Sequence, residues 1–156
     1  MCNYLQGKGD DFDWLRGHGG TTSWNTGPRK DHTLNSGVGH YMYVEASAPR
    51  KTGDGAKLVS ELFEPTSQRN GRCLQFYRHM YGPHIGDLNV YLRVKGKSDT
   101  KIWTDSGNQG NSWIQSQVPV FSSSPFRVCP LSWYFLSICH FIEVILMFNL
   151  ISPFKL

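Results

Sequence analysis

The sequence predicts an all-β fold, an antiparallel β-sandwich or jelly roll. Aromatic residues make up 13% of the 156 residues and charged residues only 18%, and 16 glycines are spread along the chain, a composition typical of short strands joined by turns. Several segments alternate apolar and polar residues with the period of two that marks a strand, and none is followed by a helical pattern. This length allows one domain and a further short segment.

The clearest alternation runs from Cys73 to Arg93, which we interpret as a hairpin of two strands around a turn that contains glycine and proline. In its second strand the side chains expected to face the core are Leu88, Val90 and Leu92, and those expected to face water are Asn89, Tyr91 and Arg93. In its first strand the inner face holds Leu74, Phe76 and Met80. Arg78 has the parity of that inner face and is its one misfit.

Four other segments have the alternation or the composition of strands, at residues 40–46, 56–62, 101–104 and 113–120. The stretches between them are rich in Gly, Ser, Asn and Pro, which favour turns and loops. Repeated strands separated by turns predict an antiparallel architecture.

An acidic segment precedes these strands, and it allows two interpretations. Asp10, Asp11 and Asp13 flank Phe12 and end at Trp14. Clustered carboxylates can hold a hard cation, although the spacing of a calcium-binding loop is absent. In the alternative, which we favour, the aspartates accept hydrogen bonds from local backbone while both aromatic rings pack inward.

The sequence offers little that would support catalysis. The six histidines have neither metal-ligand nor triad spacing, and no serine or cysteine lies in a nucleophile context. Zinc is not expected, because Cys2, Cys73, Cys129 and Cys139 form no C-x-x-C pair. The net charge of +4 is distributed over both signs, which predicts a solvated surface and no nucleic-acid partner. The residues after Met1 lack the pattern of a signal peptide.

Several motifs, taken together and in order, resemble the MAM domain, the module of meprin, the neuronal A5 antigen and the mu-type receptor phosphatase. They lie at residues 10–14, 27–33, 39–46, 73–74, 79–82, 86–92, 106–110 and 113–119. The resemblance implies a jelly-roll β-sandwich found in extracellular parts of adhesion receptors and in secreted or membrane-bound proteases. It also implies a non-catalytic module that recognises protein surfaces, in some cases those of its own copies.

The resemblance assigns roles to three residues. Cys2 and Cys73 correspond to the second and third of four family cysteines that form two disulfides, and the first and fourth are expected to be missing here. Asp31 corresponds to a residue near a cation in some family members, so calcium is the one cofactor implied. The remaining ligands of that cation are expected in the missing ends.

The resemblance covers residues 2 to 120, which divides the chain into a partial MAM domain (1–120) and an unrelated apolar tail (121–156). The stretch from Leu131 to Ile151 has Glu143 as its only charge and is long enough to cross a hydrocarbon core of about 30 Å as a helix. The tail is interpreted either as an aberrant end of the coding sequence or as a membrane anchor. With its last strands missing, the sandwich is expected to be incomplete.

Two functions therefore remain open. The first is an extracellular recognition or adhesion module, in which Tyr41, Tyr43 and Tyr91 either anchor a partner or pack within the fold. The second is a carbohydrate-binding or hydrolytic jelly roll that would use the acidic segment and the histidines.

Overall fold

The computed structural model describes residues 4–21, 23–45, 48–66, 71–133 and 143–151. Within these ranges the regular structure is entirely β. Its strands are β1 (Leu5–Gln6), β2 (Leu15–His18), β3 (His40–Glu45), β4 (Gly55–Val59), β5 (Arg72–Met80), β6 (Asp87–Val94), β7 (Thr100–Ser106), β8 (Ile114–Val120), β9 (Phe126–Trp133) and β10 (Glu143–Ile151). All pairings among them are antiparallel.

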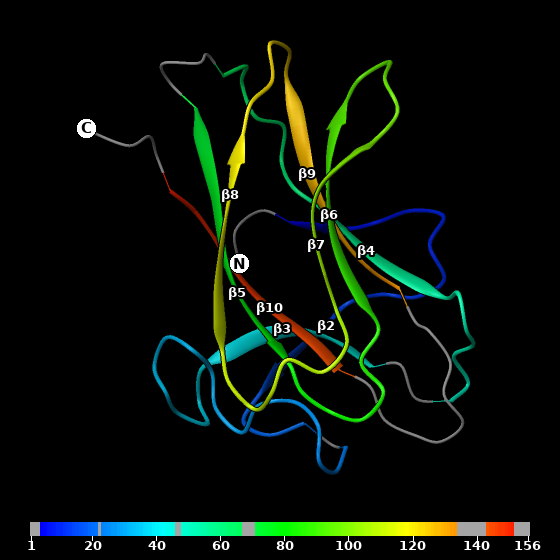
Figure 1. The fold of residues 1–156 in the computed structure, drawn as a ribbon, viewed down its shortest axis with the longest axis vertical. Helices are drawn as coiled ribbons and strands as arrows, with labels where there is room; N and C mark the ends of the chain where they lie inside the picture. The colour runs from blue at the N-terminus through cyan, green and yellow to red at the C-terminus, as the bar shows by residue number, and fades with distance from the viewer. Residues whose placement is uncertain (1–3, 22, 46–47, 67–70, 134–142, 152–156) are drawn as a thin grey trace.

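The strands form two five-stranded sheets that face each other (Figure 1). The first sheet has the order β1-β4-β9-β6-β7, and the second has the order β2-β3-β10-β5-β8. From β3 onward the chain passes repeatedly from one sheet to the other, which is the connectivity of an eight-stranded jelly roll with β1 and β2 added at the edges. The predicted antiparallel jelly-roll sandwich is confirmed.

The predicted hairpin between Cys73 and Arg93 is wrong, although both of its strands exist. Strand β5 pairs with β8 and β10, and β6 pairs with β7 and β9 in the opposite sheet. The turn at residues 81–86 therefore carries the chain across the sandwich. The hairpin in this region is instead β6–β7, closed by a turn in which Lys97 N–H donates to the carbonyl of Val94.

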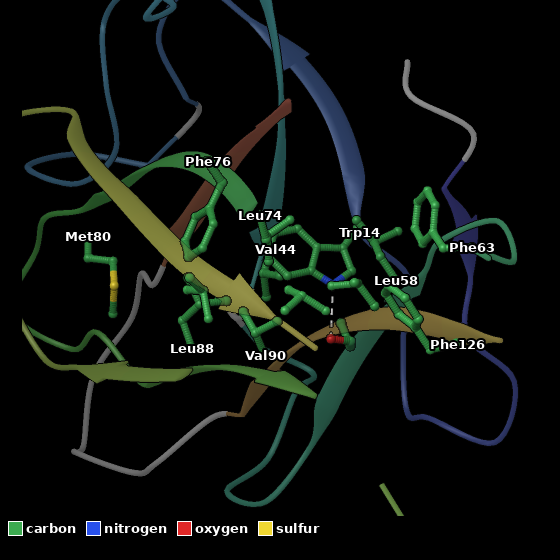
Figure 2. Packing of buried hydrophobic residues seen from close by; sticks show 14 of the residues in the cluster. Trp14, Val44, Leu58, Phe63, Leu74, Phe76, Met80, Leu88, Val90 and Phe126 are labelled. Carbon is green, nitrogen blue, oxygen red and sulfur yellow. Dashed lines mark hydrogen bonds between the residues drawn. The ribbon is translucent and has the colours of Figure 1, made fainter. Parts of the chain in front are cut away.

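The core lies between the two sheets, and Figure 2 shows part of it. Strand β5 contributes Leu74, Phe76 and Met80, all fully buried, so the predicted inner face is confirmed. Trp14 packs against side chains from both sheets, and its indole Nε1–H donates to the carbonyl of Ala56 at 2.9 Å (Figure 2). This bond satisfies the only polar atom of a 2% exposed side chain, as burial requires.

Arg78, the misfit of the inner face, joins the two sheets. Its Nε–H donates to Oδ2 of Asp105 on β7 at 2.6 Å, and a second guanidinium N–H donates to the hydroxyl of Ser116 on β8. The guanidinium also lies 5.1 Å from the ring centroid of Trp103. The charge is thus paired and hydrogen-bonded at one side of the sandwich.

Strand β6 departs from its predicted alternation at Asn89 and again after Val90, where the register with β7 shifts and Tyr91, Leu92 and Arg93 are all half-buried. Leu88 and Val90 are fully buried as expected, but Asn89 is also buried, with 3% of its surface exposed. Its side-chain oxygen accepts a hydrogen bond from the hydroxyl of Thr104 on β7 at 2.8 Å. This polar partner compensates the burial of the amide, and period two alone cannot reveal it.

The acidic segment supports strand β4. Phe12 and Trp14 are buried, as expected, but the Asp10 and Asp11 carboxylates accept hydrogen bonds from a distant strand and not from local backbone. Oδ2 of Asp10 accepts the backbone N–H of Lys57, and Oδ2 of Asp11 accepts that of Gly55. Because β1 pairs with β4 over only two residues, these carboxylates satisfy N–H groups further along the same edge.

The tail contains strands, so the helix expected from Leu131 to Ile151 is wrong. Strand β9 lies between β4 and β6, and β10 lies between β3 and β5. Residues 131–133 and 143–151 are thus paired in sheets, and residues 134–142 lie outside the described residues. In the described part of the chain there is no helix long and apolar enough to cross a membrane. The central strand of each sheet thus comes from the segment after Val120.

Candidate functional site

Loops at one end of the sandwich form a hollow of about 520 Å³, here called the Trp24 hollow. Most of it comes from the β2–β3 connection, with one residue after β5 and one before β8. Its lining residues are Gly20, Thr21, Ser23, Trp24, Asn25, Thr26, Gly27, Pro28, Arg29, Tyr81 and Asn111. Of the described residues that line it, Arg29 is the one with a charged side chain, and hydroxyl and amide groups supply most of the remaining polarity.

Hydrogen bonds hold the loop of the hollow against the end of β5. The carbonyl of Tyr81 accepts the hydroxyl of Thr26 at 2.7 Å and the backbone N–H of Gly27 at 3.2 Å. Gly82 follows with φ of 145°, and a Cβ there would lie 2.8 Å from the Thr26 hydroxyl. The two segments therefore touch too closely for any other residue at position 82.

Trp24 is the most prominent side chain of this surface. It is 83% exposed, although it belongs to a loop whose backbone is fixed on both sides. The next residue, Asn25, has φ of 56°, a left-handed conformation that asparagine tolerates better than most residues. A large indole on a braced loop loses little conformational entropy when it binds, which favours recognition of another surface.

His79 lies beside the hollow at the end of β5, with only 2% of its surface exposed. Its Nε2 is 3.1 Å from Oδ1 of Asn111, so the neutral ring donates its proton there. Nδ1 is buried and has no hydrogen-bond partner in the described structure. Burial lowers the pKa of His79 from 6.5 to about 4, only partly offset by the bond to Asn111.

Trp113 connects this end of the sandwich to the loop before β3. Its indole Nε1–H donates to the carbonyl of Lys30 at 2.9 Å, and its ring meets His79 edge-on with centroids 5.5 Å apart. Next to it, His32 stacks on Tyr77 with ring centroids 3.4 Å apart. These contacts hold the loop in register with the sheet beneath it.

Asp31 stabilises the same loop. It is 2% exposed, and its two carboxylate oxygens accept the backbone N–H groups of Leu34 and Ser36 at 2.7 and 3.1 Å. Burial by itself raises the pKa of Asp31, but the backbone hydrogen bonds outweigh it and the pKa lies below its ordinary value. Gly39 packs directly on the carboxylate, since a Cβ there would lie 2.0 Å from its Cγ.

These contacts bear on the calcium site expected at Asp31. Both carboxylate oxygens already bind amide protons, and the described residues contain no group of three or more Asp, Glu, His or Cys that could hold a metal ion. The calcium assignment stays a prediction.

The cysteines expected to form disulfides are only partly covered by the structure. Cys73 is a free, half-buried thiol on β5, and Cys129 is a free, fully buried thiol on β9. Burial raises the pKa of the Cys129 thiol, which makes this group unreactive. Cys2 and Cys139 lie outside the described residues. The disulfide roles of Cys2 and Cys73 stay predictions.

The tyrosines considered as anchors mostly pack within the fold. Tyr41 is 3% exposed and its hydroxyl donates to the carbonyl of Gly19, while Tyr43 and Tyr91 are half-buried. Sequence reasoning did not find Trp24, whose side chain is the most exposed of the large hydrophobic residues in the described part of the chain. The available signal was a large aromatic side chain inside a loop otherwise made of Gly, Thr, Ser and Asn.

The facing sheets, their strand order and the hollow built by end loops define a jelly-roll β-sandwich domain with a loop-based surface. Comparison with known proteins gives the family: the chain belongs to the MAM domain family (meprin/A5/mu), whose model matches residues 1–133. The match extends beyond Val120 and includes β9. Where the domain ends within 121–156, and how that segment arose, stay predictions.

Curated relatives agree with this assignment. The chain is 44% identical over 134 residues to MAM domain-containing glycosylphosphatidylinositol anchor protein 1 of Gallus gallus, covering 82% of this chain and 14% of the relative. It is 38% identical over 140 residues to anchor protein 2 of Homo sapiens, with the same two coverages. Thyroid hormone-induced protein B of Xenopus laevis is 41% identical over 117 residues, covering 74% and 16%. The chain thus spans about one seventh of the length of these relatives.

Among solved structures, the fold is similar to two cleaved adhesin domains of Lys-gingipain from Porphyromonas gingivalis. The K1 domain gives a TM-score of 0.60 at 14% identity and covers 98% of this chain and 90% of that one. The K3 domain gives 0.59 at 11% identity, with coverages of 97% and 91%. At these identities the likeness concerns the fold alone.

Proposed function

We propose that this domain is a non-catalytic recognition module that acts outside the cell, within a membrane-associated or secreted multidomain protein, and binds the surface of another protein. Membership of the MAM family supports the class of module. The names of its relatives, which are glycosylphosphatidylinositol anchor proteins, support a place at the outer side of the plasma membrane.

The observation that carries the proposal is the exposed indole of Trp24 at the rim of a polar hollow. Tryptophan is among the residues that contribute most to protein interfaces, because one rigid side chain removes a large apolar area from water. The surrounding hydroxyl and amide groups can form the polar rim that such an anchor needs. The hydrogen bonds of Thr26 and Gly27 to Tyr81 fix this surface before a partner arrives.

The test uses the full chain displayed on fluorescent beads, added to cells and, separately, to beads with the same chain. We expect Trp24→Ala to weaken binding by roughly 30-fold, since an anchoring tryptophan contributes about 2 kcal/mol or more. Leu62→Ala is the matched control, because Leu62 is also well exposed, at 56%, but is not one of the described residues lining the hollow. Bead-to-bead clustering that needs Trp24 would identify a second copy as the partner.

Two results would contradict the proposal. Equal binding by both variants and the parent chain would exclude the Trp24 hollow as the interface. Binding that survives protease treatment of the cells but is lost after removal of their glycans would favour a carbohydrate-binding module instead.

A further inference from the structure

Two histidines lie directly opposite each other at the exposed edge of the second sheet. His18 ends β2 and His40 begins β3, and the two residues are cross-strand partners in the antiparallel register. Strand β2 is the edge strand of its sheet, next to β3 (Figure 1). Both side chains are exposed, and their ring centroids are 5.5 Å apart with the planes tilted by 58°.

Of the other described histidines, two are engaged elsewhere and His84 is half-buried. His32 stacks on Tyr77, and His79 is buried against Asn111. By contrast, neither His18 nor His40 forms a hydrogen bond to a protein group in the described part of the chain, so both rings can turn about their side-chain bonds. Their backbones are held at the spacing of a directly opposed strand pair, about 5 Å between Cβ atoms.

We propose that His18 and His40 form a binding site for a divalent transition-metal ion, Zn²⁺ or Cu²⁺, with two protein ligands and its other positions open to water or to a partner's side chain. Neutral imidazole is a preferred ligand of both ions. The two side chains are borne by adjacent strands, so the backbone fixes their distance before the metal binds.

The ring separation agrees with this role. A metal about 2.05 Å from an imidazole nitrogen lies about 3.2 Å from the ring centroid. When each ring turns one nitrogen toward the same ion, centroids 5.5 Å apart subtend an angle of about 120° there, close to that of a tetrahedral site. A right-angled arrangement would need centroids about 4.5 Å apart, which requires a further approach of the rings.

The surroundings leave room for the ion. Gly19 and Gly20 follow His18, and Gly37 lies three residues before His40. An added Cβ at Gly20 would meet no atom within 4 Å, and one at Gly37 would meet only the Cα of Gly19, at 3.9 Å. These three glycines therefore place no side chain of their own near the two exposed imidazoles.

Titration of the full chain with ZnCl₂ in a calorimeter tests the proposal. We expect one ion per chain, and an affinity roughly tenfold to a hundredfold weaker in His18→Ala and in His40→Ala, because each leaves a single ligand. His84→Ala is the matched control and should bind as the parent does. The thiols are the same in all four proteins, so binding through cysteine would not distinguish them, and CaCl₂ should give no heat of binding at this site.

A second measurement needs no variant. Substoichiometric Cu²⁺ should broaden the imidazole NMR signals of His18 and His40 before those of His32 and His84. The proposal is overturned if zinc affinity is equal in the parent and both alanine variants, if only one of the two histidines matters, if no ion binds at millimolar zinc, or if copper broadens other residues first.

Discussion

Acid should destabilise this domain through one buried imidazole, that of His79. Burial lowers its pKa from 6.5 to about 4, and the neutral ring donates its proton to Asn111. Between these two pH values the unfolded chain carries a proton at this position and the folded chain does not. The free energy of unfolding therefore decreases as the pH falls through this window, and the contribution of His79 is fully present only above about pH 6.5.

The size of the effect follows from the two pKa values. At about 1.4 kcal/mol for each pKa unit, protonation of the unfolded chain lowers the free energy of unfolding by about 2 kcal/mol between pH 7 and about pH 4.5. Asp31 does not contribute in this window. Its pKa is lowered by its hydrogen bonds, so its contribution is present above about pH 4 and is lost only at more acidic values.

Urea denaturation at pH 7 and at pH 4.5 measures the difference. His79→Gln keeps a side-chain donor for Asn111 but cannot titrate, so its stability should fall less than that of the parent by about 2 kcal/mol over the same interval. Leu62→Ala, which changes an exposed side chain and no titratable group, should lose as much stability as the parent over this interval. An equal loss of stability in the parent and in His79→Gln would refute the argument, because all other groups titrate alike in both proteins.

Three further predictions concern groups that hold the sandwich together, each measured by the midpoint of urea or thermal unfolding. Asp31→Ala leaves two backbone N–H groups unpaired and should lower the free energy of unfolding by roughly 2–4 kcal/mol. Calcium should not raise the thermal midpoint of the parent, because both carboxylate oxygens of Asp31 already accept hydrogen bonds. A rise of the midpoint with calcium would instead support a cation site at Asp31. Arg78→Met leaves the Asp105 carboxylate without its cationic partner and should lower the free energy of unfolding by about 3–5 kcal/mol. Adding Asp105→Leu in a double variant should recover part of this loss. If it recovers none, the broken ion pair is not the cause of the loss. Trp14→Phe removes the bond to a buried carbonyl and part of the core volume and should cost about 2–4 kcal/mol, whereas an unchanged midpoint would mean that the core refills the space.

The sequence specified which side chains face inward more reliably than which strands are neighbours. A period of two assigns Phe76 and Leu88 to an inner face, and both are fully buried. It carries no information on whether the next strand pairs beside the first or crosses to the other sheet. The β5–β6 connection was therefore misread, although a jelly roll requires such crossings.

The predictions for the apolar tail and for the functional site failed for related reasons. Hydropathy from Leu131 to Ile151 is equally compatible with a membrane helix and with strands, because a continuous apolar run has no period that distinguishes the two. Asn89 is buried because of Thr104, a partner 15 residues away that only the fold brings close. Trp24 became a candidate only when the structure left it exposed while Tyr41 was buried.

The position of the last two strands has a consequence for how the chain folds as it is synthesised. Strands β9 and β10 stand third in their five-strand orders, so each joins two pairs of strands that are made earlier. Without them the first sheet separates into β1-β4 and β6-β7, and the second into β2-β3 and β5-β8. Isolated two-stranded ribbons are only marginally stable in water. Until residues 126–151 have left the ribosome, we expect four ribbons with open edges that can pair with other chains, and slow closure through contacts between distant parts of the sequence.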